Sequence, residues 1–75
     1  MEKPLTALPP GGEGVVVKIS GGRGLSRRLL EMGLTPGTLV KVLVNSRGPI
    51  IVLVRGVSIA LGRGIASRVI VKVTT

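Results

Sequence analysis

The sequence predicts a mainly β protein, a small barrel or sandwich of short strands with one inserted helix. Three observations support this prediction. Val and Ile are abundant, and β-branched side chains favour strands. Short apolar segments recur at near-regular spacing between turns rich in Gly, Pro and Ser, a pattern typical of small all-β folds. Only one segment of about two turns places apolar residues at helical spacing.

We expect the 75 residues to form a single domain with a small core. A chain of this size buries only about 60% of the surface that it exposes when unfolded. Phe, Trp and Tyr are absent, so the core must be packed from aliphatic side chains. Cysteine is absent as well, so no disulfide can stabilise the fold.

Five segments are predicted strands because they are apolar, β-branched and bounded by turn residues. They are Gly14–Ile19, Thr38–Val44, Ile50–Val54, Val57–Leu61 and Arg68–Val73. Gly62–Ser67 is long enough for one helical turn. We interpret Ile50–Val54 as an exposed edge of the sheet. Long apolar edges gain from pairing with a neighbour, so we expect a homodimer or a higher oligomer.

One short helix is predicted from the apolar residues Leu25, Leu29 and Met32, which recur at positions i, i+4 and i+7. A flexible loop, Ser20–Gly24, precedes it. Isolated helices of this length are marginal in water, so the leucines must pack on the sheet. Leu30 adds a fourth apolar side chain. A helix of two turns cannot bury four apolar side chains on one stripe. We therefore expect one leucine to remain exposed as a docking anchor.

The end of this helix is specified by the sequence that follows it. Gly33 suits the left-handed position after the last helical residue, which would let Leu34 fold back onto Leu29. Pro36 and Gly37 then occupy the second and third positions of a type II turn. We therefore expect the chain to reverse directly into a strand.

The composition argues against catalysis and against a metal site within one chain. His, Cys, Tyr and Asp are absent, and the only carboxylates are Glu2, Glu13 and Glu31. General acid–base catalysis needs a positioned group with a tunable pKa, and Zn²⁺ or Fe²⁺ needs imidazole, thiolate or clustered carboxylates. We expect no enzyme, cofactor or metal; glutamates shared between subunits are the remaining route to a metal site.

The excess of basic residues indicates an acidic partner. The chain has 11 Lys and Arg residues against 3 acidic residues, for a net charge of +8. A positive surplus of this size affects which partners a protein attracts and does not determine its fold. Without aromatic residues, the chain cannot offer an aromatic groove for proline-rich peptides or a stacking platform for single-stranded nucleic acid. We predict partner binding by arginines and the two adjacent leucines of the helical segment: Arg23, Arg27, Arg28, Arg63, Arg68, Leu29 and Leu30.

Two blocks of the sequence resemble the FeoA family, ferrous iron transport protein A. Leu29–Thr38, with the sequence LLEMGLTPGT, resembles the helix–Gly–Leu–x–Pro–Gly signature of that family. The spacing of Leu61, Ala66, Val69 and Val71 resembles its second block, which is generic β sequence. The resemblance extends from about Leu8 to Val73.

The resemblance implies an SH3-like barrel of about five strands with one short inserted helix. It also implies a cytoplasmic accessory protein that acts on FeoB, a membrane transporter with a cytoplasmic GTPase domain. The same domain occurs at the C-terminus of DtxR-type metal-dependent repressors, but 75 residues leave no room for their helix-turn-helix. We do not carry over the metal association of the family, because the ligands are missing.

The leading hypothesis is thus a non-enzymatic cytoplasmic module that binds the cytoplasmic part of FeoB. The alternative is a nucleic-acid-binding SH3-like barrel of the ribosomal or translation type, which the basic Gly-Arg loops would suit. Self-assembly alone is a third possibility. The sequence shows neither a signal-peptide pattern nor an apolar run of the roughly 20 residues that a membrane span needs.

Overall fold

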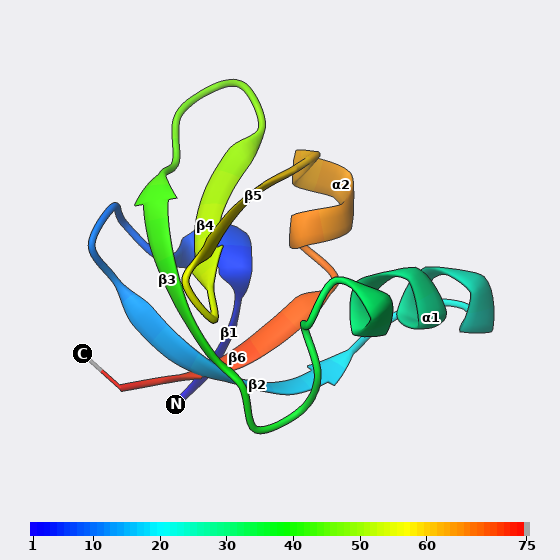
Figure 1. The fold of residues 1–75 in the computed structure, drawn as a ribbon. Helices are drawn as coiled ribbons and strands as arrows, with labels where there is room; N and C mark the ends of the chain where they lie inside the picture. Colours follow the sequence, from blue (N-terminus) through cyan, green and yellow to red (C-terminus); the bar gives the residue numbers. More distant parts are fainter. Residues whose placement is uncertain (75) are drawn as a thin grey trace.

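The computed structural model describes residues 1–74, in which six strands form one antiparallel sheet. The strands are β1 (Glu2–Pro4), β2 (Glu13–Ile19), β3 (Leu39–Val44), β4 (Ile50–Val54), β5 (Val57–Leu61) and β6 (Val69–Val73). Their order across the sheet is β1-β6-β2-β3-β4-β5. The sheet curls on itself (Figure 1) and encloses one aliphatic core, and β1 and β5 are its two edges.

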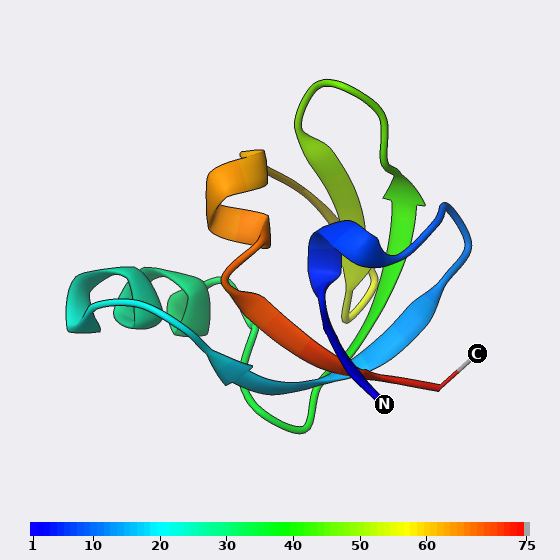
Figure 2. The ribbon, with the colours of Figure 1, turned by 180° about the vertical axis from the view of Figure 1, so that it is seen from behind.

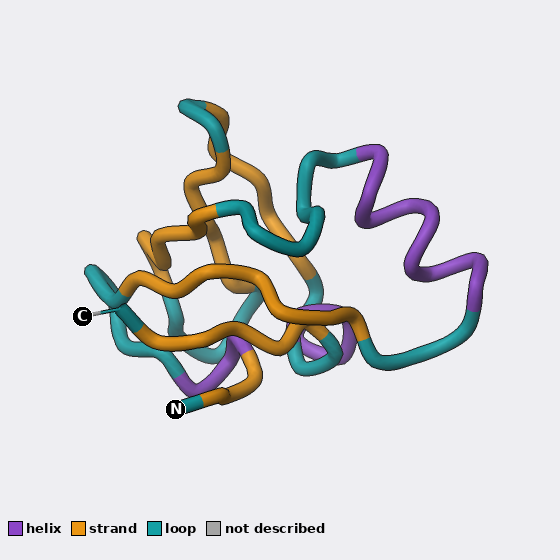
Figure 3. Tube along the Cα trace, turned by 90° about the horizontal axis from the view of Figure 1, so that it is seen from below, coloured by secondary structure: helices purple, strands orange, loops and turns teal. Residues whose placement is uncertain are grey.

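Three helical segments connect these strands. They are the 3₁₀ turn η1 (Leu5–Ala7) and the α-helices α1 (Arg23–Glu31) and α2 (Arg63–Ala66). Seen from behind, η1 lies on the side of the curled sheet away from α1 (Figure 2). The view from below shows that α1 lies outside the curl of the strands, where it joins β2 to β3 (Figure 3). The helix therefore presents much of its surface to solvent.

The five predicted strands are confirmed to within one residue, but the sheet contains a sixth that we did not predict. This strand, β1, pairs with β6 through Lys3↔Val71 and Pro4↔Ile70. Its three residues include a proline and two charged side chains, so no apolar pattern reveals it. Proline is tolerated there because β1 is an edge strand, which needs ladder hydrogen bonds on one side only.

The prediction that Ile50–Val54 forms an exposed edge was wrong. In the structure this strand, β4, pairs with β3 on one side and with β5 on the other. Its apolar run reflects burial within the sheet, since its side chains alternate between the core and a half-buried outer position. The expected oligomer loses this basis and stays a prediction.

The helix begins earlier than the sequence pattern suggests. We predicted a loop over Ser20–Gly24, whereas α1 starts at Arg23. Gly22 precedes the helix in an extended conformation, and its carbonyl accepts a hydrogen bond of 3.1 Å from the amide of Ser26. Gly24 therefore lies in the first turn, where a glycine lowers helix propensity without preventing the helix.

The predicted helix end is confirmed. The amide of Leu34 donates to the carbonyl of Leu29 at 3.0 Å and the amide of Gly33 donates to that of Leu30 at 3.0 Å, which is the Schellman pattern. Gly33 has φ +93°, a value that side chains disfavour. Gly37, with φ +92°, then completes the type II turn.

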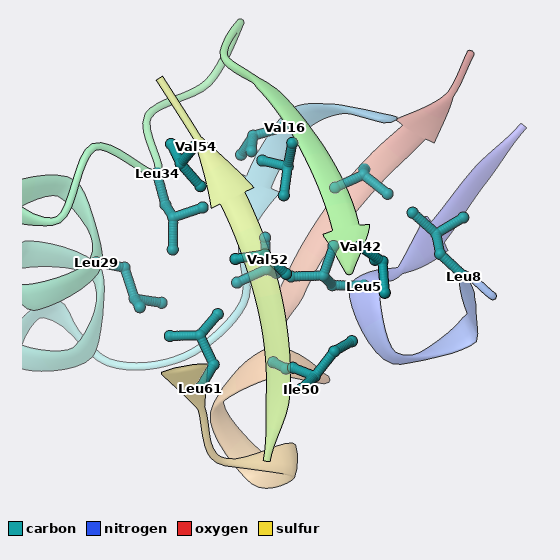
Figure 4. Packing of buried hydrophobic residues seen from close by; sticks show 14 residues of the cluster. Leu5, Leu8, Val16, Leu29, Leu34, Val42, Ile50, Val52, Val54 and Leu61 are labelled. Atoms are coloured by element: carbon teal, nitrogen blue, oxygen red, sulfur yellow. The ribbon is translucent and has the colours of Figure 1, made fainter. Parts of the chain in front are cut away.

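The core is entirely aliphatic, and Figure 4 shows how its side chains interlock. Leu29 and Leu34 are 2% and 0% exposed and lie at one end of the core beside Leu61 (Figure 4). Leu5 and Leu8, from the N-terminal segment that the sequence pattern missed, are also buried. The remaining members are Val16, Val40, Val42, Ile50, Val52, Val54, Ala66, Val69 and Val71.

Two glycine-to-alanine changes should shift stability in opposite directions. Gly33→Ala forces a side chain into the left-handed conformation and should lower the free energy of unfolding by about 1 kcal/mol. Gly24→Ala meets no atom within 4 Å and, as an alanine in a helix, should raise it by about 0.5–1 kcal/mol. Urea unfolding followed by circular dichroism measures both, and a loss from Gly24→Ala would contradict the observed helix start.

Candidate functional site

The exposed face of α1 is basic and carries one large apolar side chain. Arg23, Arg27 and Leu30 are spaced four and three residues apart, so they lie on one face of the helix. All three are exposed, and Leu30 is 42% accessible. The prediction that one leucine of this segment remains exposed is confirmed. Leu29, on the opposite side, is instead a core residue.

Arg68 brings a further cation to the start of α1 from a distant part of the sequence. It precedes β6, and its carbonyl accepts a hydrogen bond of 2.7 Å from the amide of Ser20, just before α1. A Cβ placed on Gly21 would lie 3.3 Å from Nη1 of Arg68 and 3.0 Å from Cδ2 of Leu25. The Arg68 side chain therefore lies over the segment that leads into the helix.

A groove of about 140 Å³ lies on the other side of α1. Its walls come from α1, from the end of β5 and from α2, and its lining residues are Leu25, Arg28, Leu29, Met32, Ala60, Leu61, Gly62 and Ile65. The lining is apolar except for Arg28. Leu29 and Leu61 are buried at its base, whereas Met32 is 40% exposed. This groove can accept an apolar side chain and offers a cation beside it.

We call Arg23, Arg27, Arg28, Leu30 and Arg68 the docking surface. All five were predicted from the sequence, because they are basic or adjoin the helical stripe. The residues that β5 and α2 contribute to the neighbouring groove, such as Ala60 and Ile65, were not predicted. The one hint in the sequence is Ile65, a single large apolar residue between glycine and small residues, which indicates that this turn packs against the rest of the fold.

Arg63, which we also predicted to bind a partner, makes hydrogen bonds within the fold. Its Nη1 donates to Oδ1 of Asn45 at 2.8 Å and to the carbonyl of Ser46. The Asn45 amide in turn donates to the carbonyls of Thr6 at 3.0 Å and Leu8 at 2.7 Å. These bonds join α2, the β3–β4 loop and η1, so we do not include Arg63 in the docking surface.

The carboxylates do not assemble into a reactive or metal-binding group. Glu2, Glu13 and Glu31 lie on β1, β2 and α1. Within residues 1–74, no three His, Cys, Asp or Glu side chains gather where they could hold a metal ion. Nor does any helix of that part of the chain combine the length and apolar character that crossing a membrane requires.

Comparisons with known proteins match almost the whole chain. The sequence profile of the FeoA domain matches residues 3–73. A Methanocaldococcus jannaschii protein inferred to be an Fe(2+) transport protein A is 41% identical over 69 residues, which cover 92% of this chain and 84% of that protein. The crystal structure of an iron uptake regulatory protein (FeoA) is 48% identical, with a TM-score of 0.90 over 97% of both chains.

Two further structures bear on the fold. One is FeoA from Stenotrophomonas maltophilia, a procaryotic SH3 domain protein complexed with zinc, which is 28% identical to this chain. The match has a TM-score of 0.80 and covers 96% of this chain and 89% of that protein. A manganese-dependent transcriptional repressor matches 96% of this chain with 41% of its length, at a TM-score of 0.89 and 24% identity. The predicted SH3-like fold is confirmed, and so is its presence within a larger repressor.

Removing the Asn45 side chain should cost stability without altering the docking surface. Asn45→Ala leaves the carbonyls of Thr6 and Leu8 and the Arg63 guanidinium without their partner. The loss of these part-buried bonds should lower the free energy of unfolding by about 1–3 kcal/mol. Chemical denaturation measures the loss. An unchanged midpoint would show that the Asn45–Arg63 contacts do not hold these three segments together.

Proposed function

The chain belongs to the FeoA family of ferrous iron transport accessory proteins, and on that premise we propose that it is a non-enzymatic module that binds the cytoplasmic, GTPase-bearing part of the FeoB transporter. The observation that carries this proposal is the docking surface, in which one exposed leucine and three exposed arginines lie on α1 and a fourth arginine, Arg68, lies over the segment that leads into it. Large exposed apolar side chains framed by charge are typical of protein interfaces.

Charge complementarity supports an acidic partner surface. The chain has a net charge of +8, and Arg23, Arg27 and Arg28 are concentrated on one short helix. Fields of this kind accelerate association with a surface of opposite sign and orient the encounter. Arginine also forms two parallel hydrogen bonds with a carboxylate, which gives such contacts a defined geometry.

The groove beside α1 supplies the apolar part of the interaction. Arg28 and Met32 border it, and Leu25 and Ile65 line it. A large apolar side chain of the partner fits this volume, while a neighbouring carboxylate would meet Arg28. Burial of apolar side chains supplies most of the binding free energy of such contacts, and the charged groups at the rim fix the orientation of the partner. On this proposal the protein is cytoplasmic, where that part of FeoB is found.

Changes on the docking surface should weaken the binding of the cytoplasmic domain of FeoB. Leu30→Asp replaces the large exposed apolar side chain of α1 with a charge and should raise the Kd about tenfold or more. Arg27→Glu should slow association, and this effect should diminish as salt shortens the screening length to about 10 Å at 0.1 M. Surface plasmon resonance at two salt concentrations measures both rates.

Matched control variants lie on the β3 strand and the loop after it. Leu43 is 38% exposed, close to the value of Leu30, and Arg47 is exposed on the β3–β4 loop. Leu43→Asp and Arg47→Glu should leave the Kd nearly unchanged. Absence of binding by the wild-type chain at low salt would refute the proposal. Tight binding of duplex RNA that persists at physiological salt would favour a nucleic-acid partner instead, because phosphate contacts weaken steeply with salt.

A further inference from the structure

A second hollow lies on the outer face of the sheet and shares no residue with the docking surface or its groove. It has a volume of about 450 Å³ and opens where the α1–β3 turn and the β4–β5 turn come together. Its lining residues are Glu13, Gly37, Thr38, Leu39, Lys41, Leu53, Arg55 and Gly56. A hollow of this volume is within the range of small-molecule sites.

Arg55, at the rim of this hollow, has a backbone conformation that arginine disfavours. Arg55 and Gly56 have φ values of +51° and +81° and join β4 to β5 in a two-residue turn. Turns with positive φ at both positions favour Asn or Gly at the first. Arg55 is the only residue other than glycine with positive φ in residues 1–74. Such strain is concentrated at functional sites, which suggests that the guanidinium itself is needed here.

The Arg55 guanidinium retains most of its hydrogen-bonding capacity. Its one side-chain bond within residues 1–74 runs from Nη2 to Oγ1 of Thr38 at 3.4 Å, near the outer limit for such a bond. Thr38 is buried, with 8% of the residue exposed, and its hydroxyl lies 2.7 Å from the hydroxyl of Thr35. The arginine is therefore positioned over the hollow while most of its donors remain available for an anion.

Lys41 supplies a second cation, and two leucines supply an apolar surface. In the sheet, Lys41 lies opposite Leu53 on β4 and opposite Glu13 on β2. Leu39 lies two residues before Lys41, so it is on the same face of the strand, and it is 50% exposed. The hollow thus combines two cations with an apolar surface and one carboxylate. A second copy of the chain, also with a net charge of +8, would be repelled from it.

We propose that this hollow binds an organic phosphate. The phosphate lies between Arg55 and Lys41, where guanidinium and ammonium groups can both contact its oxygens. The apolar or aromatic body of the ligand covers Leu39 and Leu53. Glu13 limits the affinity for the anion, because its carboxylate lies opposite Lys41. This site and its ligand are independent of the binding of FeoB.

Phenyl phosphate is the probe, because it joins a phosphate to one aromatic ring. Titration into ¹⁵N-labelled protein should shift the amide signals of Thr38, Leu39 and Gly56 in a saturable manner. Inorganic phosphate should shift the same signals at higher concentration, since it lacks the ring, and phenol should shift them little. Shifts spread over the basic surface, or confined to α1, would overturn the proposal.

Arg55→Asn separates binding from folding. Asparagine adopts positive φ more readily than arginine, so this variant should be at least as stable as the wild type while its Kd for phenyl phosphate rises about tenfold. Arg47→Asn removes the same charge from the β3–β4 loop. This control should change the Kd by no more than about twofold, because exposed charges are screened over a Debye length of about 10 Å.

Glu13→Gln should act in the opposite direction. Removing the carboxylate that lies opposite Lys41 should tighten binding of phenyl phosphate, whereas a purely structural role for Glu13 would leave the Kd unchanged or raise it. Equal losses from Arg55→Asn and Arg47→Asn would show that the probe responds only to net charge. That result, or weaker binding by Glu13→Gln, would overturn the proposed site.

Discussion

The packing of Leu29 and Leu34 against one end of the core is the interaction on which the rest of the structure depends. A nine-residue helix does not persist alone in water, so α1 exists because these two leucines are buried. The hydrogen bond from the Leu34 amide to the Leu29 carbonyl fixes their relative position. Because that contact also sets the rotation of the helix, it decides that Arg23, Arg27 and Leu30 face the solvent.

The local parts of the structure could be predicted from the sequence, since their determinants lie within a few residues. Gly33, Pro36 and Gly37 act through backbone geometry at their own positions, and the helical spacing identifies Leu29 as a core candidate. The strands β2 to β6 follow from short apolar runs between turns. Each of these features depends on separations of fewer than ten residues or so, over which propensity and periodicity are informative.

The features that escaped prediction depend on partners distant in the sequence. β1 has no apolar pattern and forms because β6 offers it an unpaired edge. Arg63 resembles the solvated arginines in sequence, yet it meets Asn45 across the fold. The outer hollow likewise requires that the turn at Arg55 lie against Thr38. Pairings of this kind are decided by the topology of the sheet, which no single segment encodes.

Hydrogen exchange at the Leu34 amide is the most direct test of the proposed anchor. If the Leu29–Leu34 contact holds α1 to the core, this amide should open only with the global unfolding that exposes the Val71 amide in β6. The Arg23 amide, in the first turn of the helix, should exchange rapidly as an internal reference. Exchange of Leu34 at the rate of an unstructured peptide, with Val71 still protected, would contradict the account.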